Sequence, residues 1–179
     1  MILDLRRLPI LETERLRLDP LTVEDAEALF PLLADPEVLA YWDSPEPDDP
    51  DVVAGVVRNL VDDMQAGRAI HLAMRTLADR AFVGCFDITE IDRRHRRADV
   101  GFMLSRQAWG EDYGLEAMRT VIAYLAASGL RRLTARTNLG ARRSESVLEK
   151  LGFEEEGLLR GHILEDGERR DCRLFGLLL

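Results

Sequence analysis

Three strand-like runs follow one another closely between residues 70 and 104, and this spacing limits the chain to a small set of folds. The runs cover 70–75, 82–91 and 99–104, with turns indicated by Ala78-Asp79 and by an arginine-rich stretch. Connections this short join neighbouring strands as hairpins, because a parallel crossover needs a dozen or more residues. The centre of the chain is therefore expected to form an antiparallel sheet.

The hydrophobic period changes after residue 110, which brings helices into the fold. Apolar residues between 115 and 125 share one helical face up to Gly129. A strand over 133–137 and a short helix over 144–151 come next, and segments 153–164 and 170–178 form a final hairpin. Strands separated by helices need parallel crossovers, so we expect a mixed sheet.

The N-terminal third adds one strand and two helices. Residues 14–18 alternate polar and apolar side chains, as in a half-buried strand. Thr22, with Asp25 three residues later, predicts a helix start and a helix over 23–34. Apolar residues at helical spacing from 52 to 64 predict a second helix. The resulting order, βααβββαβαββ, predicts an α/β fold in which a mixed, mainly antiparallel twisted sheet of about seven strands is flanked by four helices.

Composition places these elements in one domain and excludes several classes of protein. The chain has 179 residues, of which 46% are hydrophobic, and a single domain over 1–179 is expected. No apolar run is long enough to span a bilayer and residues 1–7 do not resemble a signal peptide, so the protein is expected to be cytoplasmic. Cys85 and Cys172 are expected to be reduced thiols, and no metal site is predicted.

The net charge of −9 argues against general binding of nucleic acid, because a polyanion is repelled at long range. The arginine-rich stretch, residues 93–97, is more simply a solvated loop than a phosphate-binding patch. An acidic protein does attract cationic amines, although many cytoplasmic proteins share this property.

A loop that contains two glycines leads from the strand over 99–104 into the helix that follows. The start of a helix presents free backbone N–H groups at the positive end of the helix dipole, and small residues let the backbone come close to a ligand. Such a loop can hold a pyrophosphate. The spacing alone is equally compatible with an ordinary strand-to-helix turn.

Several motifs resemble, in the same order, those of the GNAT superfamily of N-acetyltransferases, and most of all the branch that acetylates the N-termini of ribosomal proteins. The resemblance extends over about residues 12–178. The motifs are Glu12-Thr13-Glu14-Arg15-Leu16-Arg17-Leu18, Asp35-Pro36-Glu37-Val38, Arg97-Ala98-Asp99-Val100-Gly101-Phe102, Trp109-Gly110-x-x-Tyr113-Gly114-x-Glu116-Ala117, Val147-Leu148-Glu149-Lys150-Leu151-Gly152-Phe153, Glu156-Gly157 and Asp166-Gly167-x-x-Arg170-Asp171.

The resemblance implies that acetyl-coenzyme A (acetyl-CoA) is the acetyl donor and that a primary amine attacks its thioester directly. The amine would belong to a protein N-terminus or a small molecule. In this family the fourth strand splays from the fifth and pantetheine lies between them. Backbone binding of the cofactor is therefore expected at Phe102, Met103 and Leu104, and binding of its pyrophosphate at Trp109, Gly110, Glu111, Asp112, Tyr113 and Gly114.

Two positions depart from the family pattern, and both concern the cofactor. Asp112 stands where the loop usually has glycine, and its carboxylate could repel pyrophosphate by an amount on the order of 1 kcal/mol. Ala141 replaces the asparagine expected three residues before Ser144. These departures leave open a second interpretation, in which the chain is a catalytically silent GNAT-like module that binds CoA or senses a ligand.

The resemblance also supplies candidates for catalysis. Ser144 is a candidate general acid and cofactor contact, with a helix N-cap as the structural alternative. Asp99 matches the acidic residue at the start of the family's fourth strand and is a candidate general base, unless it only forms an ion pair with an arginine such as Arg97. Glu90 is a second candidate base. His71 is expected to be a satisfied strand residue.

The acceptor pocket is harder to assign, because variable loops build it. Tyr41 and Trp42 follow the first helix, near the segment that lines the acceptor pocket in relatives, and they either face the substrate or pack in the core. His162 is a further candidate for this pocket. The identity of the amine does not follow from the sequence, and a homodimer is expected only by analogy with relatives.

Overall fold

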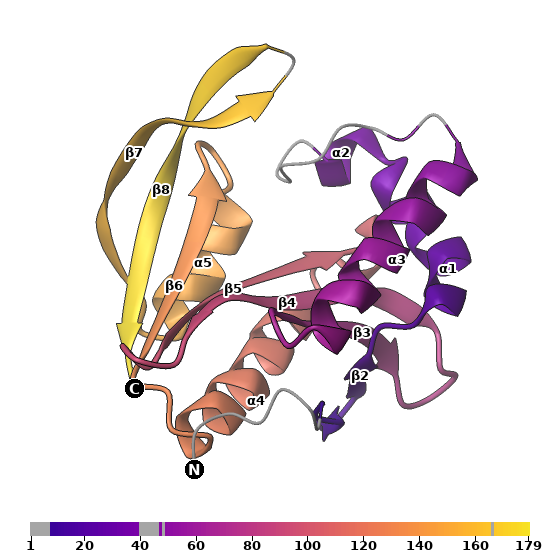
Figure 1. Ribbon diagram of the computed structural model, residues 1–179, viewed down its shortest axis with the longest axis horizontal. Coiled ribbons are helices and arrows are strands. Elements are labelled where there is room, and N and C mark those ends of the chain that lie inside the picture. The colour runs from indigo at the N-terminus through magenta and orange to yellow at the C-terminus, as the bar shows by residue number, and fades with distance from the viewer. Residues whose placement is uncertain (1–7, 40–46, 48, 166) are drawn as a thin grey trace.

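The computed structural model describes residues 8–39, 47, 49–165 and 167–179, and it forms one twisted sheet with helices on both faces (Figure 1). A 3₁₀ turn precedes α1 at Val23–Asp25, and another, at Arg106–Ala108, precedes α4. The strands are β1 (Leu11–Glu12), β2 (Leu16–Pro20), β3 (Ile70–Thr76), β4 (Phe82–Asp92), β5 (Arg97–Leu104), β6 (Arg132–Asn138), β7 (Glu154–Glu165) and β8 (Glu168–Leu178). The helices are α1 (Ala26–Leu33), α2 (Pro36–Leu39), α3 (Pro50–Gln65), α4 (Tyr113–Ala127) and α5 (Arg142–Lys150).

The sheet has the strand order β1-β2-β3-β4-β5-β6-β8-β7, and only β5 and β6 pair in parallel. The predicted α/β class and mixed, mainly antiparallel sheet are confirmed. The predicted counts were too low: the described residues form eight strands and five helices. The additional elements, β1 and α2, have two and four residues. Elements this short leave no measurable period in the sequence.

Two element boundaries near the N-terminus differ from the prediction. The strand expected over 14–18 begins at Leu16, because the Thr13 N–H and hydroxyl both bond to the Leu16 carbonyl and close a turn. The helix expected from residue 23 begins with a 3₁₀ turn. Thr22 and Asp25 form the capping box that the sequence predicts there.

The alternation of side chains along the strands separates two cores. The first lies under α4 and α5, where Met118, Val121 and Leu148 pack against residues of the sheet such as Phe86 and Leu133. The second lies on the opposite face, under α1, α2 and α3. Both cysteines are buried and are thiols that form no disulfide, and burial raises the pKa of the Cys85 thiol well above its ordinary value.

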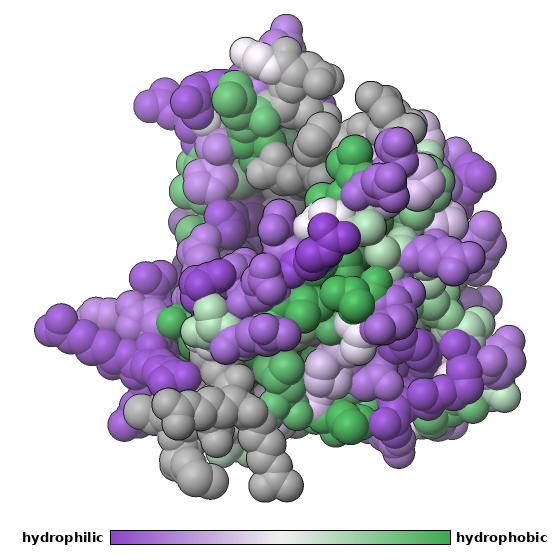
Figure 2. Space-filling view, turned by 45° about the vertical axis from the view of Figure 1, so that its right-hand side comes forward, coloured by the Kyte–Doolittle hydropathy of each residue, from purple (hydrophilic) through white to green (hydrophobic). Residues whose placement is uncertain are grey.

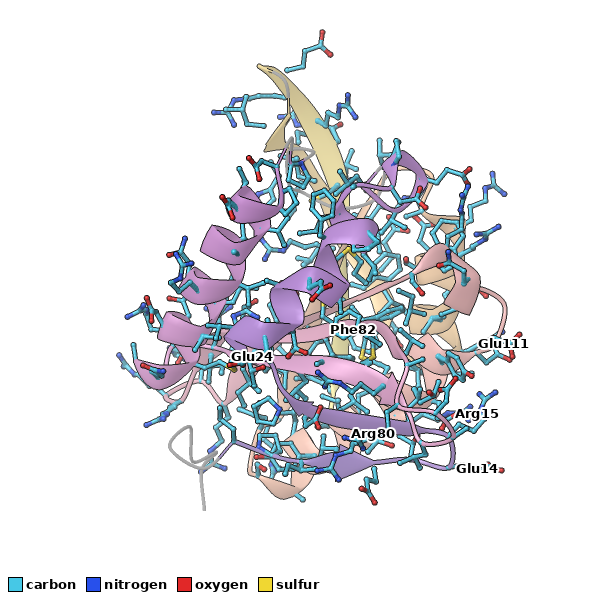
Figure 3. All side chains as sticks on the ribbon, turned by 90° about the vertical axis from the view of Figure 1, so that its right-hand side faces the viewer. Glu14, Arg15, Glu24, Arg80, Phe82 and Glu111 are labelled. Carbon is cyan, nitrogen blue, oxygen red and sulfur yellow. The ribbon has the colours of Figure 1, made fainter. Side chains whose placement is uncertain are left out.

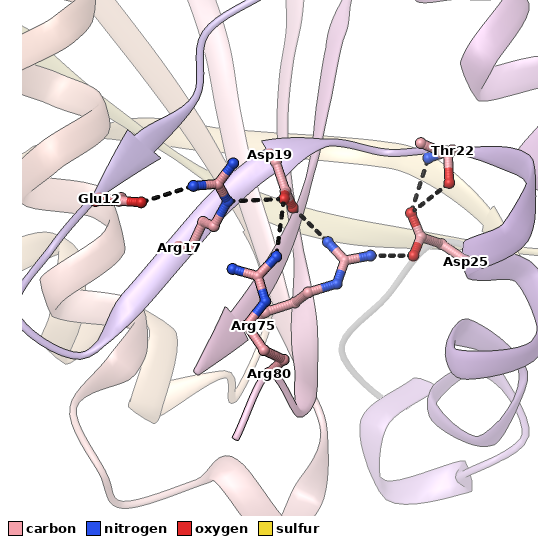
Figure 4. A network of polar contacts seen from close by, with 7 residues as sticks. All are labelled: Glu12, Arg17, Asp19, Thr22, Asp25, Arg75 and Arg80. Carbon is pink, nitrogen blue, oxygen red and sulfur yellow. Dashed lines mark hydrogen bonds and ion pairs between the residues drawn. The ribbon is translucent and has the colours of Figure 1, made fainter. Parts of the chain in front are cut away.

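A network of charged side chains ties the N-terminal strands to the start of α1 (Figure 4). Arg75 on β3 forms ion pairs with Asp19 and Asp25, and Arg17 bridges Asp19 and Glu12. The Asp25 carboxylate also accepts from the Thr22 N–H at 2.8 Å. Because Asp25 and Arg75 are largely buried, removal of one partner would leave an uncompensated charge.

Hydrophilic residues cover most of the face drawn in Figure 2, with hydrophobic residues exposed in patches between them. Among the described residues, no helix is both long and apolar enough to cross a bilayer. The arginine-rich stretch lies in the turn between β4 and β5, where Arg93, Arg94 and Arg96 are exposed. Its assignment as a solvated loop is confirmed.

Candidate active site

The sheet opens between β5 and β6. Their parallel pairing comprises only Arg97 with Arg132, Ala98 with Leu133, and Asp99 with Thr134. Beyond Asp99, β5 stays paired with β4 as far as Leu104 but no longer pairs with β6. The splay expected from the family resemblance is therefore present, and it leaves backbone groups of β5 facing a gap.

The hydrogen-bond pattern identifies which backbone groups these are. The Ser105 N–H donates to the Val83 carbonyl at 2.9 Å. Since bonded and non-bonded pairs alternate along an antiparallel ladder, Cys85 and Met103 also form a bonded pair. The N–H groups of Phe102 and Leu104 then point away from β4, toward the gap. The Met103 N–H points toward β4, so it is a weaker candidate for a backbone contact than its two neighbours.

A cleft of about 1080 Å³ continues from this gap along the start of α4 and α5, and we call it the donor cleft. Its volume is large enough for an extended nucleotide-containing ligand. Its lining includes all the predicted cofactor contacts except Glu111. Those lining residues are Phe102, Met103, Leu104, Trp109, Gly110, Asp112, Tyr113, Gly114 and Ser144.

The loop of residues 109–114 brings the start of α4 close to β5. A Cβ atom on Gly114 would lie 2.5 Å from Cε2 of Phe102, so only glycine permits this approach. The indole Nε1–H of Trp109 donates to the Leu104 carbonyl at 3.1 Å and holds the loop to the strand. Gly110 has a φ of 86°, which also favours glycine.

Arg15 braces the same loop from the N-terminal side (Figure 3). Its guanidinium donates to the Glu111 carbonyl at 2.8 Å, pairs with Glu116 at 2.7 Å and lies 4.7 Å from the centre of the Tyr113 ring. Glu116 also accepts hydrogen bonds from the Thr13 hydroxyl and the Arg15 N–H. Although burial opposes the shift, these bonds hold the pKa of Glu116 below its ordinary value.

Positive charge gathers at the α5 side of the donor cleft. Arg142, Arg143 and Lys150, the only lysine of the chain, line it, and none of the three forms an ion pair among the described residues. The Arg143 guanidinium lies 4.7 Å from the centre of the Trp109 ring. Arg106, by contrast, is neutralised by Asp35 and Glu37. Main-chain amides, a helix start and unpaired cations fit the phosphate groups of acetyl-CoA.

The two departures from the family pattern have structural explanations. Asp112 adopts φ 58° and ψ 15°, a left-handed conformation that explains why glycine is usual there. Its exposed carboxylate makes no capping hydrogen bond to α4 and leaves the cleft open. Ala141 is the N-cap residue of α5, so the alternative role of Ser144 as an N-cap is wrong. Ser144 lies one turn inside the helix and lines the cleft.

A second cavity, of about 310 Å³, adjoins the donor cleft, and we call it the acceptor pocket. The two cavities share Phe102, Ala141 and Ser144 in their walls, so they meet where the strands separate. The polar or charged residues that line the acceptor pocket are Asp87, Thr89, Asp99, Arg136, Thr137, Asn138, Ser144, His162 and Cys172.

Asp99 is buried in this pocket and is fully bonded. One carboxylate oxygen accepts from the Thr134 hydroxyl at 2.6 Å, and the other accepts from Arg136 at 2.7 and 3.2 Å. The alternative of an ion pair with an arginine is confirmed, but the partner is Arg136 and not Arg97, because the parallel register places Thr134 and then Arg136 beside Asp99. Arg97 pairs with Asp92 instead, at 3.6 Å.

Arg136 brings the other predicted residues together. It pairs with Glu90 at 2.9 Å, and its Nη1 lies 3.0 Å from Nε2 of His162. Because a guanidinium can only donate, Nε2 of His162 is the acceptor of this bond. Burial opposes the shift, but the charges of Asp99 and Glu90 raise the pKa of Arg136 above its ordinary value. Tyr41 and Trp42 lie outside the described residues.

Sequence reasoning missed Arg136, Asp87 and the environment of His71. His71 is a buried residue of β3 and pairs with Asp87 at 2.6 Å through Nδ1, but its Nε2 has no hydrogen-bond partner among the described residues. The prediction of a satisfied strand residue therefore holds for the strand and for one of the two ring nitrogens. Asp87 and His71 lie directly opposite each other on β4 and β3. The alternation of side chains along each strand could have predicted the face on which each residue lies. It could not have predicted the register that sets the two residues opposite each other.

Comparison with known proteins agrees with this geometry. Residues 15–154 match the family model described as an acetyltransferase (GNAT) domain. The chain is 30% identical over 169 residues to an uncharacterised N-acetyltransferase, p20, of Bacillus licheniformis, covering 94% of this chain and 95% of that protein. In structure it is similar to RimJ of Mycobacterium smegmatis in complex with CoA-disulfide, with a TM-score of 0.80, 26% identity, and coverage of 91% of this chain and 81% of that chain.

The fold is also that of RimL, a ribosomal L7/L12 α-N-protein acetyltransferase in complex with coenzyme A. The TM-score is 0.86 at 16% identity, with 96% of this chain and 98% of that chain covered.

Proposed function

Because this chain belongs to the GNAT acetyltransferase family and is an acetyl-CoA-dependent acyltransferase, we propose that its acceptor is a primary amine, either a protein N-terminus or a small-molecule amine. One observation carries the proposal. The donor cleft and the acceptor pocket meet at the point where β5 leaves β6, so a donor and an amine can approach each other there from opposite sides.

On the donor side, acetyl-CoA supplies an acetyl group activated as a thioester. The N–H groups of Phe102 and Leu104 would hold its extended arm, as an added strand would be held. The loop from Trp109 to Gly114 would bind the pyrophosphate through backbone amides, supported by Arg142 and Arg143. We propose that the Phe102 N–H also stabilises negative charge on the thioester oxygen, because Phe102 lies at the junction of the two cavities.

On the acceptor side, the protein must remove a proton from the amine and return one to the sulfur. Ser144 is at the junction of the cavities, and we retain it as the proposed acid. Asp99 and Glu90 remain predictions for the base. Both carboxylates already form ion pairs with Arg136. These contacts fit better with a role in which Asp99 and Glu90 hold the Arg136 side chain in place at the acceptor pocket.

The two departures from the family pattern were the grounds for the alternative of a silent binding module, and among the described residues neither of them blocks a cavity. Asp112 leaves the donor cleft open. Ala141 lines both cavities and closes neither of them. Isothermal calorimetry with acetyl-CoA tests the first half of the proposal: micromolar binding is expected, and absence of heat at millimolar ligand would overturn it.

The second half is tested by thiol release from acetyl-CoA with a panel of acceptors. The panel contains tetrapeptides with free α-amino groups, their N-acetylated counterparts as matched controls, and n-alkylamines. We expect turnover with free amines only. Binding of acetyl-CoA without turnover of any member of a broad panel would favour the module.

A further inference from the structure

The acceptor pocket contains a carboxylate that the catalytic predictions did not include. Asp87 lies on β4 and lines the pocket. One oxygen, Oδ1, lies 2.6 Å from Nδ1 of His71. Its second oxygen has no hydrogen-bond or ion-pair partner among the described residues, and the side chain is 18% exposed. Asp87 therefore presents one free oxygen to the pocket.

His71 orients this carboxylate through one hydrogen bond. The His71 side chain is only 5% exposed, and its Nε2 has no partner among the described residues. Nδ1 is the ring nitrogen that lies within hydrogen-bond distance of Asp87, so an Nδ1–H group donates to Oδ1 of the carboxylate. This bond fixes one oxygen of Asp87 and leaves the other facing the pocket.

The contrast with Asp99 is direct. Both oxygens of Asp99 are bonded, one to Thr134 and one to the Arg136 guanidinium, so its charge is already compensated. Glu90 shares the same guanidinium. Asp87, in contrast, contacts no arginine among the described residues, and only its Oδ1 is bonded, so a cation entering the pocket can bind its second oxygen.

The position of Asp87 also suits the reaction. Its Cα partner across the ladder is Gly101, the residue before Phe102. A Cβ atom on Gly101 would meet no atom within 4 Å, so the space in front of this pair is open. Bonded pairs in an antiparallel ladder have Cα atoms about 5.5 Å apart, which places Asp87 beside the segment where the two cavities meet.

We propose that Asp87 binds the ammonium group of the acceptor and removes its proton, with His71 as the residue that positions the carboxylate. This inference rests on the proposed function and narrows its substrate class to amines that arrive as cations. Loss of one proton to Asp87 frees the nitrogen electron pair; the N–C bond then forms and the thioester C–S bond breaks. The nitrogen then loses its second proton, and the departing thiolate takes up one proton to become the thiol. Asp87 releases its own proton to solvent.

Asp87→Asn tests the catalytic part with n-propylamine and an alanine tetrapeptide as acceptors. We expect kcat to fall about 100-fold or more, in the range of a lost general base. The affinity of this variant for acetyl-CoA, measured by calorimetry, should stay within twofold of that of the wild type, which would show that the variant is folded. Asp99→Asn is the matched comparison, with an expected loss in kcat at least tenfold smaller. The reverse order of the two losses would overturn the proposal.

His71 is tested by two variants that differ in one hydrogen bond. The amide of His71→Asn can donate from nearly the position of Nδ1, whereas His71→Leu cannot donate. We expect kcat with n-propylamine to fall at least tenfold more in the leucine variant, with the KM for acetyl-CoA unchanged in both. Equal losses in the two variants would show that His71 does not act through this bond.

A binding measurement keeps this inference separate from the proposed function. In protein labelled with ¹³C-aspartate, titration with n-propylammonium chloride should shift the Asp87 carboxyl signal, identified by its absence from Asp87→Asn. A saturating shift supports the inference even if no acceptor of the panel is acetylated. A static Asp87 signal would refute it, even in an enzyme that acetylates the alanine tetrapeptide.

Discussion

At the scale of single residues, backbone conformation and local packing shape the 109–114 loop. Gly110 and Asp112 both have positive φ angles, and Gly114 lies against the ring of Phe102. Glycine adopts the left-handed region without cost, whereas an aspartate there loses on the order of 1 kcal/mol. Glycine is therefore required or favoured at 110, 112 and 114, and Asp112 is the one of these positions where the chain has another residue.

Asp112→Gly should tighten binding of acetyl-CoA. The substitution removes a negative charge from the cleft, an effect of about 1 kcal/mol or less. We expect the Kd measured by calorimetry to fall about fivefold. Asp112→Asn, which also removes the charge but keeps a side chain, should lower the Kd by a similar factor. A Kd that stays constant or rises in the glycine variant would show that the carboxylate points away from the ligand.

Gly114→Ala should damage both stability and cofactor binding. Its Cβ would overlap the Phe102 ring, so either α4 or β5 must move, which typically costs about 1–3 kcal/mol. Urea denaturation measures the loss. Gly55→Ala in α3 is the matched control, because nothing lies within 4 Å of its added Cβ and alanine favours the helix by about 0.5–1 kcal/mol. Equal stability of the two variants would contradict this packing.

At the scale of elements, the start of α4 is held from two directions. Trp109 fixes the loop to the end of β5, while Arg15 and Thr13 fix Glu116 of α4 to the segment between β1 and β2. The N-terminal strands thus help to set the position of a helix start some hundred residues away. This coupling makes the donor cleft sensitive to changes far from it in sequence.

Glu116 should contribute to stability in a pH-dependent way. Its pKa is lower in the folded protein than the ordinary value of 4.5, so its contribution is complete above that pH and is lost as the pH falls through the folded value. Glu116→Gln should therefore lower the free energy of unfolding at pH 7, and the difference from the wild type should shrink below about pH 4.5. Denaturant titrations at several pH values measure this. A difference that stays constant down to pH 3 would argue against the linkage.

At the scale of the whole molecule, three parallel residue pairs are all that join β5 to β6 within the sheet. Strands β1 to β5 lie on one side of this junction, and β6, β7 and β8 lie on the other (Figure 1). The proposed cofactor site lies between these two parts, so a ligand there would contact both. Binding to the folded state alone must then stabilise the entire fold.

Acetyl-CoA should raise the midpoint of thermal unfolding in a concentration-dependent way. At 100 times its Kd, the expected gain is about 2.7 kcal/mol in the free energy of unfolding. Sodium acetate at the same concentration is the control, because it lacks the nucleotide. Arg143→Ala should weaken the shift by removing an unpaired cation from the cleft. Equal midpoints with and without acetyl-CoA would count against the donor cleft as its site.

The fold could be predicted from the sequence because, in each long strand or helix, apolar residues recur at the spacing typical of that element. Strands β3, β4 and β5 and helices α3 and α4 were located to within a few residues from local patterns. The contacts of the site could not be predicted in the same way. Asp99 meets Arg136, and Asp87 meets His71, through strand register, which depends on the packing of the whole sheet. The roles of the site residues, and the homodimer, stay predictions.

The position of Lys150 has a practical consequence for work with this enzyme. Arginine supplies every other cationic side chain apart from histidine, so these residues contain a single side-chain amine, and it lies on the rim of the donor cleft. Self-acetylation of a lysine during purification or assay can thus occur at one place only. Mass spectrometry of the peptide that contains Lys150 would report it directly, and Lys150→Arg gives an enzyme preparation free of that background.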